Sequence, residues 1–191
     1  EDEVDMDFYH RNSHPTAKEI LQDSFYWKIA DDLSPIGNDI AADALSVFWS
    51  WRDENGFAPT LWFTTEEFLR WGFSEEQLEQ VVTGKWEDRI GSSKLHLAAN
   101  CFDDLIISIA FGQFIKEGSL DKDLKEEALK SIDRQLNSEV LNYRCFGSFE
   151  AKDAYTKTKE ALLIMPTKSY SLIDSFKFWR FLFTSFIKKR I

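Results

Sequence analysis

The stretch from Leu97 to Ile115 constrains the fold of this chain most, because it is apolar on almost every side of a helix. The polar residues that interrupt it are Asn100, Asp103, Asp104, Ser108 and Gln113. They make the stretch too polar to cross a membrane, and a soluble helix that is apolar all round has to be buried. We therefore predict a central core helix at about 97–115.

Amphipathic segments on both sides of this stretch need a common apolar partner, which the central helix supplies. The predicted helices begin after His14, at Asn38, at capping boxes opened by Thr64 and Ser74, after Ser119 or Asp121, and near Phe149. A chain of 191 residues that is 43% hydrophobic suffices for one core. The fold class we predict is mainly α: a single-domain, irregular helical bundle around the central helix.

Two glycines bear on that central helix. Gly112 lies inside it, where glycine costs about 1 kcal/mol relative to alanine, so we expect a neighbouring segment to pack closely there. Gly118 is expected to end it.

Charge divides the chain unevenly. The net charge is −10, yet residues 166–191 carry six Lys or Arg and one acid, which makes that tail +5 and leaves −15 for residues 1–165. We therefore divide the chain into an acidic N-terminal arm (1–12), a helical domain (13–165) and a basic, aromatic C-terminal helix (166–191). The acidic balance argues against nucleic acid and favours a basic protein partner.

Cysteine usage and motifs indicate a cytoplasmic protein without a cofactor. Cys101 and Cys145 fit neither a disulfide framework nor a Cys/His metal spacing. No glycine-rich phosphate-binding motif and no nucleophile elbow occurs in the sequence. No secretory signal is visible at the N-terminus as given.

The segment Ser34-Pro35-Ile36-Gly37-Asn38-Asp39 predicts a stiff turn that opens a helix, with Asn38 as its N-cap. Asp39 and Asp43 then lie one turn apart on one helical face. With Asp103 and Asp104 they can form a carboxylate site for Mg²⁺ or Mn²⁺, with His96 as a possible base. In the simpler interpretation each Asp serves a helix start, a loop amide or an arginine such as Arg52.

Aromatic residues crowd the first half of the chain around Trp51 and Arg52. Most aromatics are expected in the core, where they bury a large area. Exposed aromatic residues and arginines are typical of interface hot spots, the few residues that supply most of the binding energy between proteins. The residues we expect at a binding site are Asp39, Asp43, Trp51, Arg52, Asp103 and Asp104.

The tail from Ser171 to Ile191 places Phe176, Trp179 and Phe183 near helical spacing and ends in Lys188-Lys189-Arg190. We expect it to fold as a helix docked on the acidic body. An interfacial membrane helix and a dimerisation arm are the alternatives, so the oligomeric state stays open.

The chain resembles the bacterial YfeS-like proteins at several short motifs. They are His14-Pro15 with Ala17-Lys18, Phe25-Tyr26-Trp27, Ser34 to Asp39 with Asp43, Trp51-Arg52, Ala110-Phe111-Gly112-Gln113 and Glu117-Gly118. The resemblance implies a bacterial, cytoplasmic protein and no catalytic residues. Small acidic proteins of this kind look like immunity proteins of toxin systems, by analogy.

These observations lead to two hypotheses. The first is a non-enzymatic cytoplasmic protein-binding module, specifically an immunity-type inhibitor of a basic toxin domain. The second is a metal-dependent helical hydrolase that uses the Asp cluster.

Overall fold

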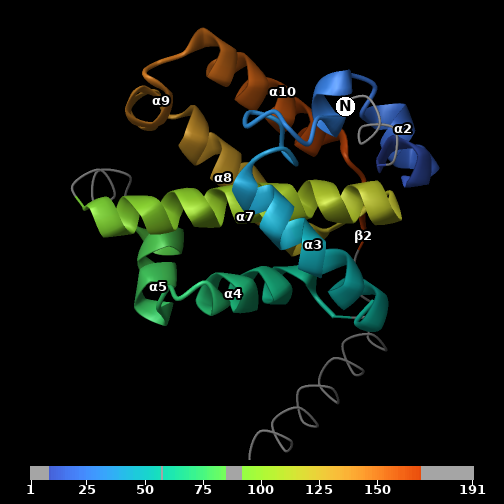
Figure 1. Cartoon of the computed structure of the whole chain (residues 1–191), viewed down its shortest axis with the longest axis horizontal. Helices are drawn as coiled ribbons and strands as arrows, with labels where there is room; N and C mark the ends of the chain where they lie inside the picture. The colour runs from blue at the N-terminus through green and yellow to red at the C-terminus, as the bar shows by residue number, and fades with distance from the viewer. Residues whose placement is uncertain (1–8, 57, 85–91, 169–191) are drawn as a thin grey trace, which may run out of the picture.

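A long helix, α7 (Ser93–Glu117), runs through the middle of the molecule, and the other helices pack around it (Figure 1). The computed structural model describes residues 9–56, 58–84 and 92–168. Side chains on all faces of α7 are fully buried, among them Leu105, Ile106, Ile109, Phe111 and Phe114. The predicted mainly α bundle around a central apolar helix is confirmed.

The elements before α7 are α2 (Pro15–Ile20), the 3₁₀ helix η1 (Ser24–Trp27), α3 (Asp39–Glu54), α4 (Thr60–Arg70) and α5 (Glu75–Thr83). After α7 come β1 (Leu120–Asp121), α8 (Lys122–Leu136), α9 (Ser138–Cys145), α10 (Phe149–Ile164) and β2 (Thr167–Lys168). Helices α3, α4, α5 and α8 all pack against α7, and α10 packs against α8.

Local sequence signals explain most helix starts. The side chain of Asn38 accepts a hydrogen bond from the Ala41 amide at 2.8 Å, as predicted for the cap of α3. Ser74 and Gln77 form the predicted capping box of α5. His14 caps α2 through Nδ1, which accepts from the Thr16 amide.

The predicted helix start at Thr64 is wrong. Helix α4 begins four residues earlier, at Thr60, where the backbone amide donates to Oδ2 of Asp121 at 2.8 Å. Thr64 therefore lies inside the helix, buried, with its hydroxyl bonded to the Leu61 carbonyl. The start is fixed by a residue distant in sequence, which a local pattern cannot reveal.

Helix α9 was not predicted.

Both glycines of the central helix behave as expected. A Cβ on Gly112 would lie 2.3 Å from Cδ2 of Leu45, so α3 approaches α7 closely at that point. Gly118 has a φ of 68° and ends the helix in the left-handed conformation. Close packing of α3 on α7 therefore depends on the absence of a side chain at Gly112.

The C-terminal part of the described chain returns to the end of α7. Strand β2 pairs in parallel with β1, with Leu120 opposite Thr167 and Asp121 opposite Lys168. The folded body thus extends beyond the predicted boundary at Met165. The predicted docked helix over Ser171–Ile191 lies outside the described residues, as do residues 1–8 of the N-terminal arm.

The expectation that the central stretch is too polar to cross a membrane is wrong as a statement about composition. One helix among the described residues, over Lys94–Glu117, is long and apolar enough to cross a membrane by length and composition alone. Of its most apolar window, 67% is buried inside the protein, which is the burial pattern of a core helix.

Candidate functional site

The four predicted aspartates do not form one site. Asp39 and Asp43 are exposed on α3, whereas Asp103 is buried and Asp104 half-buried on α7. Within the described part of the chain, no three His, Cys, Asp or Glu side chains come close enough to hold a metal ion. The alternative hypothesis, in which these carboxylates converge on a metal ion, therefore finds no support among the described residues.

Asp103 is an ion-pair partner inside the bundle. Its Oδ1 accepts from Nε of Arg134 at 2.9 Å and from Nη2 at 2.5 Å. Arg134 also donates to Glu127 and Ser131 on its own helix. Burial lowers the pKa of Arg134, but the carboxylates of Asp103 and Glu127 outweigh that effect and raise it. This cluster joins α7 to α8.

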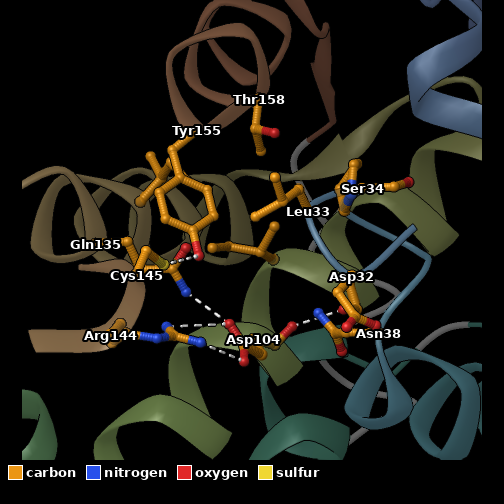
Figure 2. A pocket seen from close by; sticks show the side chains of 14 residues that line it. Asp32, Leu33, Ser34, Asn38, Asp104, Gln135, Arg144, Cys145, Tyr155 and Thr158 are labelled. Carbon is orange, nitrogen blue, oxygen red and sulfur yellow. Dashed lines mark hydrogen bonds and ion pairs between the residues drawn. The ribbon is translucent and has the colours of Figure 1, made fainter. Parts of the chain in front are cut away.

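The other predicted acid of α7, Asp104, lies beside a cavity of about 340 Å³, which is bordered by the loop before α3 and by α7, α8, α9 and α10 (Figure 2). Its Oδ2 accepts from Nη2 of Arg144 at 2.9 Å, and its Oδ1 accepts from Nε2 of Gln135 at 2.6 Å. Tyr155 from α10 directs its hydroxyl toward the same space, with Sγ of Cys145 3.8 Å away.

His96, the candidate base, makes its contacts away from Asp39 and Asp43. Its Nε2 lies 2.8 Å from Nδ2 of Asn100, and its ring packs edge-on against Tyr143 at 4.3 Å between centroids. Burial, and then the charge of Arg144, lower the pKa of His96. None of these contacts brings the imidazole to Asp39 or Asp43.

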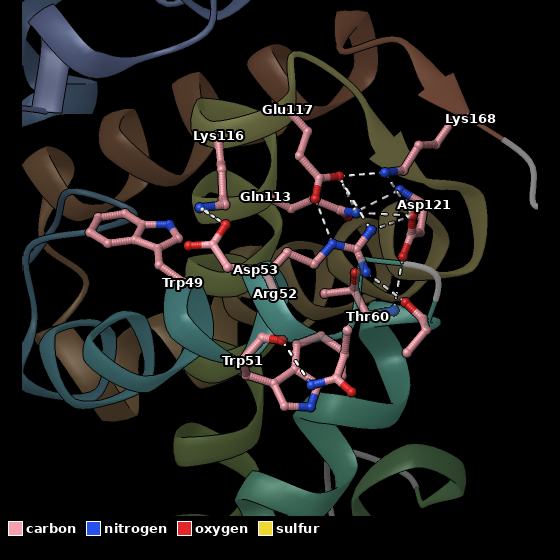
Figure 3. A network of polar contacts seen from close by, with 12 residues as sticks. Trp49, Trp51, Arg52, Asp53, Thr60, Gln113, Lys116, Glu117, Asp121 and Lys168 are labelled. Atoms are coloured by element: carbon pink, nitrogen blue, oxygen red, sulfur yellow. Dashed lines mark hydrogen bonds and ion pairs between the residues drawn. The ribbon is translucent and has the colours of Figure 1, made fainter. Parts of the chain in front are cut away.

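Arg52 is not exposed as a binding residue; it is 2% exposed and forms the centre of a polar network (Figure 3). Its Nε donates to Oε1 of Glu117 at 2.5 Å, and its Nη1 donates to the Ala58 carbonyl at 2.6 Å. Lys168 of β2 donates to Oε2 of the same glutamate. Three segments, α3, α7 and β2, are therefore held together by one carboxylate.

The network continues through two further buried side chains. Gln113 donates through Nε2 to Glu117 at 3.0 Å and to Asp121 at 2.9 Å, and its Oε1 accepts from the Asp121 amide. Burial raises the pKa of Glu117, but the hydrogen bonds and charges of Arg52 and Lys168 outweigh burial and lower it. Glu117 is thus held as a carboxylate.

Trp51, the residue next to Arg52, faces a different environment. It lines a groove of about 550 Å³ between α3 and α4, which we call the Trp51 groove. Its ring packs against Phe63 at 4.8 Å and Trp62 at 6.1 Å between centroids. Behind it, Phe48 contacts Phe63 at 5.3 Å. The floor of the groove is therefore a fixed aromatic cluster.

The rim of the Trp51 groove is acidic. Glu54 from α3 and Glu66 from α4 are exposed, and Glu67 is buried and bonded to Arg70. These residues give the groove three carboxylates against one guanidinium. The formal charge of its lining is therefore −2, which favours a cationic ligand.

Sequence reasoning missed several of these residues. Gln113 and Glu117 are polar residues four apart on the apolar helix, a spacing that signals a shared buried partner. Arg134 and Arg144 carried no local signal, because their partners lie 31 and 40 residues away.

Comparison with known proteins identifies no relative of this chain. The chain matches no family model, no curated protein and no solved structure. The resemblance to the YfeS-like family stays a prediction, and the functional argument rests on the geometry above.

Proposed function

We propose that this protein is a non-enzymatic binding module that captures a basic segment of another protein in the Trp51 groove. The observation that carries the proposal is the combination of an aromatic floor with an acidic rim. A Lys or Arg side chain placed over a Trp ring gains about 0.5–2 kcal/mol from cation–π attraction, depending on its solvation. Glu54 and Glu66, both exposed in the lining of the groove, supply the opposite charge.

The groove is also held rigidly, which lowers the entropic cost of binding. Trp51 is preceded by Phe48 one turn earlier and followed by Arg52, whose guanidinium is fixed by Glu117 and the Ala58 carbonyl. A hot spot needs such a well-packed support, because binding energy concentrates where side chains are already ordered. We therefore assign Trp51 to the contact surface and Arg52 to its support.

A net charge of −10 extends the same preference beyond the groove. Complementary charge speeds association and disfavours acidic partners. The specific form we propose is an immunity-type inhibitor in the cytoplasm, whose acidic groove covers a basic surface of a toxin domain.

Selection from a random peptide library displayed on phage tests the groove while its natural partner is unidentified. Full-length wild-type protein is the target, and a Glu54→Lys/Glu66→Lys variant is the counter-target. We expect enriched peptides to carry Lys or Arg beside an apolar residue, and to bind the counter-target at least tenfold more weakly. Enrichment of acidic peptides, or equal binding to both targets, would refute the proposal.

The immunity form has its own test. A toxin encoded next to this gene should lose its activity in cells that express wild-type protein and keep it in cells that express the Glu54→Lys/Glu66→Lys variant. Cells that remain sensitive to the toxin despite expressing wild-type protein would rule out the inhibitor role. Binding of basic peptides in the groove would still be tested separately by the phage selection.

A further inference from the structure

The cavity beside Asp104 is separate from the Trp51 groove, because the two have no lining residue in common. The cavity volume of about 340 Å³ would hold roughly eleven water molecules at the density of liquid water. Protein interiors contain few voids larger than one water, whereas small-molecule pockets begin at about 300 Å³. The cavity is partly open to solvent at the exposed Asp32, and its volume lies in the range of small-molecule pockets.

Two buried side chains present polar atoms to this space without a strong partner. Tyr155 is 8% exposed, and its hydroxyl has only the Cys145 thiol at 3.8 Å among the described residues. Gln135 is 2% exposed and donates through Nε2 to Asp104, which leaves its Oε1 without a hydrogen bond from any described residue. Both atoms therefore have hydrogen-bonding capacity to offer to a ligand that enters the cavity.

The charges around the cavity select against ions. Asp104 and Arg144 compensate each other through a 2.9 Å ion pair. Asp32, an acid at the edge of the cavity, disfavours anions. Burial raises the pKa of Tyr155, so its hydroxyl keeps its proton and acts as a donor. A neutral ligand that can both donate and accept hydrogen bonds fits this lining.

The remaining walls are apolar, with Leu33, Ile107 and Ile132 lining the same space. We infer that the cavity binds an uncharged, hydroxyl-rich molecule of about a dozen non-hydrogen atoms, the size of a monosaccharide. Its hydroxyl groups donate to Oε1 of Gln135 and accept from the Tyr155 hydroxyl, while its C–H faces pack on the apolar walls. The Asp104–Arg144 pair contributes polarity without net charge.

Calorimetric titration of the full chain with D-glucose, D-galactose, D-mannose and myo-inositol tests the inference, with thermal unfolding as a second readout. We expect saturable binding of at least one of them and a matching rise in Tm. Tyr155→Phe keeps the ring and removes only the hydroxyl, and should weaken binding about tenfold. Leu33→Trp, which fills part of the cavity, should abolish binding.

Two controls complete the experiment. Tyr143→Phe alters an exposed tyrosine outside the cavity and should leave the Kd unchanged. D-gluconate, nearly the same size as glucose but anionic, should bind more weakly than the neutral sugars. The inference is overturned if none of the four compounds saturates up to about 50 mM, if Tyr155→Phe and Leu33→Trp bind like the wild type, or if gluconate binds as tightly.

Discussion

Near its C-terminal end, α7 presents Gln113 and Glu117 to a network in which Arg52, Asp121 and Lys168 meet, whereas its middle presents Asp104 to a cavity. Both regions contain an Arg–carboxylate pair that is at least half-buried. They differ in what surrounds it: the network is filled by protein groups, and the cavity leaves Tyr155 and Gln135 with spare hydrogen-bonding capacity.

This difference separates structural from functional polar groups. A buried charge that meets only protein partners holds segments together, and removing one partner is costly. A buried polar group that faces open space is available to a ligand. On this basis Arg52 has a structural role, although the sequence suggested binding, and the surroundings of Asp104 are where we propose a ligand site.

Substitution of Arg52 should have the largest effect on stability. Arg52→Ala leaves Glu117 and Asp121 without their buried cation, so we expect a loss of about 3–5 kcal/mol in the free energy of unfolding. Urea denaturation at pH 7 measures it. Tyr155→Phe is the comparison on the cavity side, and should change the free energy by less than about 0.5 kcal/mol, because its hydroxyl has no strong partner among the described residues.

If both substitutions cost the same, the distinction between a closed network and an open cavity fails. If Arg52→Ala leaves the free energy of unfolding almost unchanged, the distinction fails as well.

Close packing of α3 should give the next largest effect. Gly112→Ala places a methyl group 2.3 Å from the original position of Leu45 Cδ2, so Leu45 has to move. Overpacking of this kind costs about 1–3 kcal/mol. Combining it with Leu45→Ala in a double-mutant cycle should show a favourable coupling energy; additive costs would mean that the two residues do not compete for space.

The network should also make stability depend on pH. Since the pKa of Glu117 lies below its ordinary value of about 4.3, its contribution is present above that pH and is lost as the pH falls through the lowered value. Urea denaturation between pH 7 and pH 3 should show wild-type protein losing its advantage over Glu117→Gln in this acid range. A constant difference between the two proteins down to pH 3 would contradict the assignment.

Helix prediction succeeded where the signal is local. Asn38, Ser74 and Gly118 mark helix ends through their own backbone and side-chain chemistry, and the apolar residues of α7 identify it as the core helix. The start of α4 and the partners of Asp103, Asp104 and Arg52 depend on residues more than 30 positions away, which the fold brings together but no local pattern encodes.

A substitution at the corner between α9 and α10, beside the cavity, should change stability modestly and in the opposite direction. Phe146 has a φ of 51° and is 97% exposed, so its side chain contributes no packing to offset the strain of a left-handed conformation. Phe146→Gly should therefore raise the free energy of unfolding by about 1 kcal/mol. A destabilised variant would mean that the phenyl ring contacts a part of the chain outside the described residues.

The most direct test of the proposed function compares two charge reversals on the same protein. A basic peptide selected against the wild type is titrated calorimetrically into Glu54→Lys/Glu66→Lys and into Asp43→Lys/Glu79→Lys, which alters two exposed acids outside the groove. We predict that the groove variant binds at least tenfold more weakly and that the control stays within about threefold of the wild type, because rim charges act mainly through local complementarity. Equal losses in both variants would show that net charge alone attracts the peptide, and would contradict a binding site at Trp51.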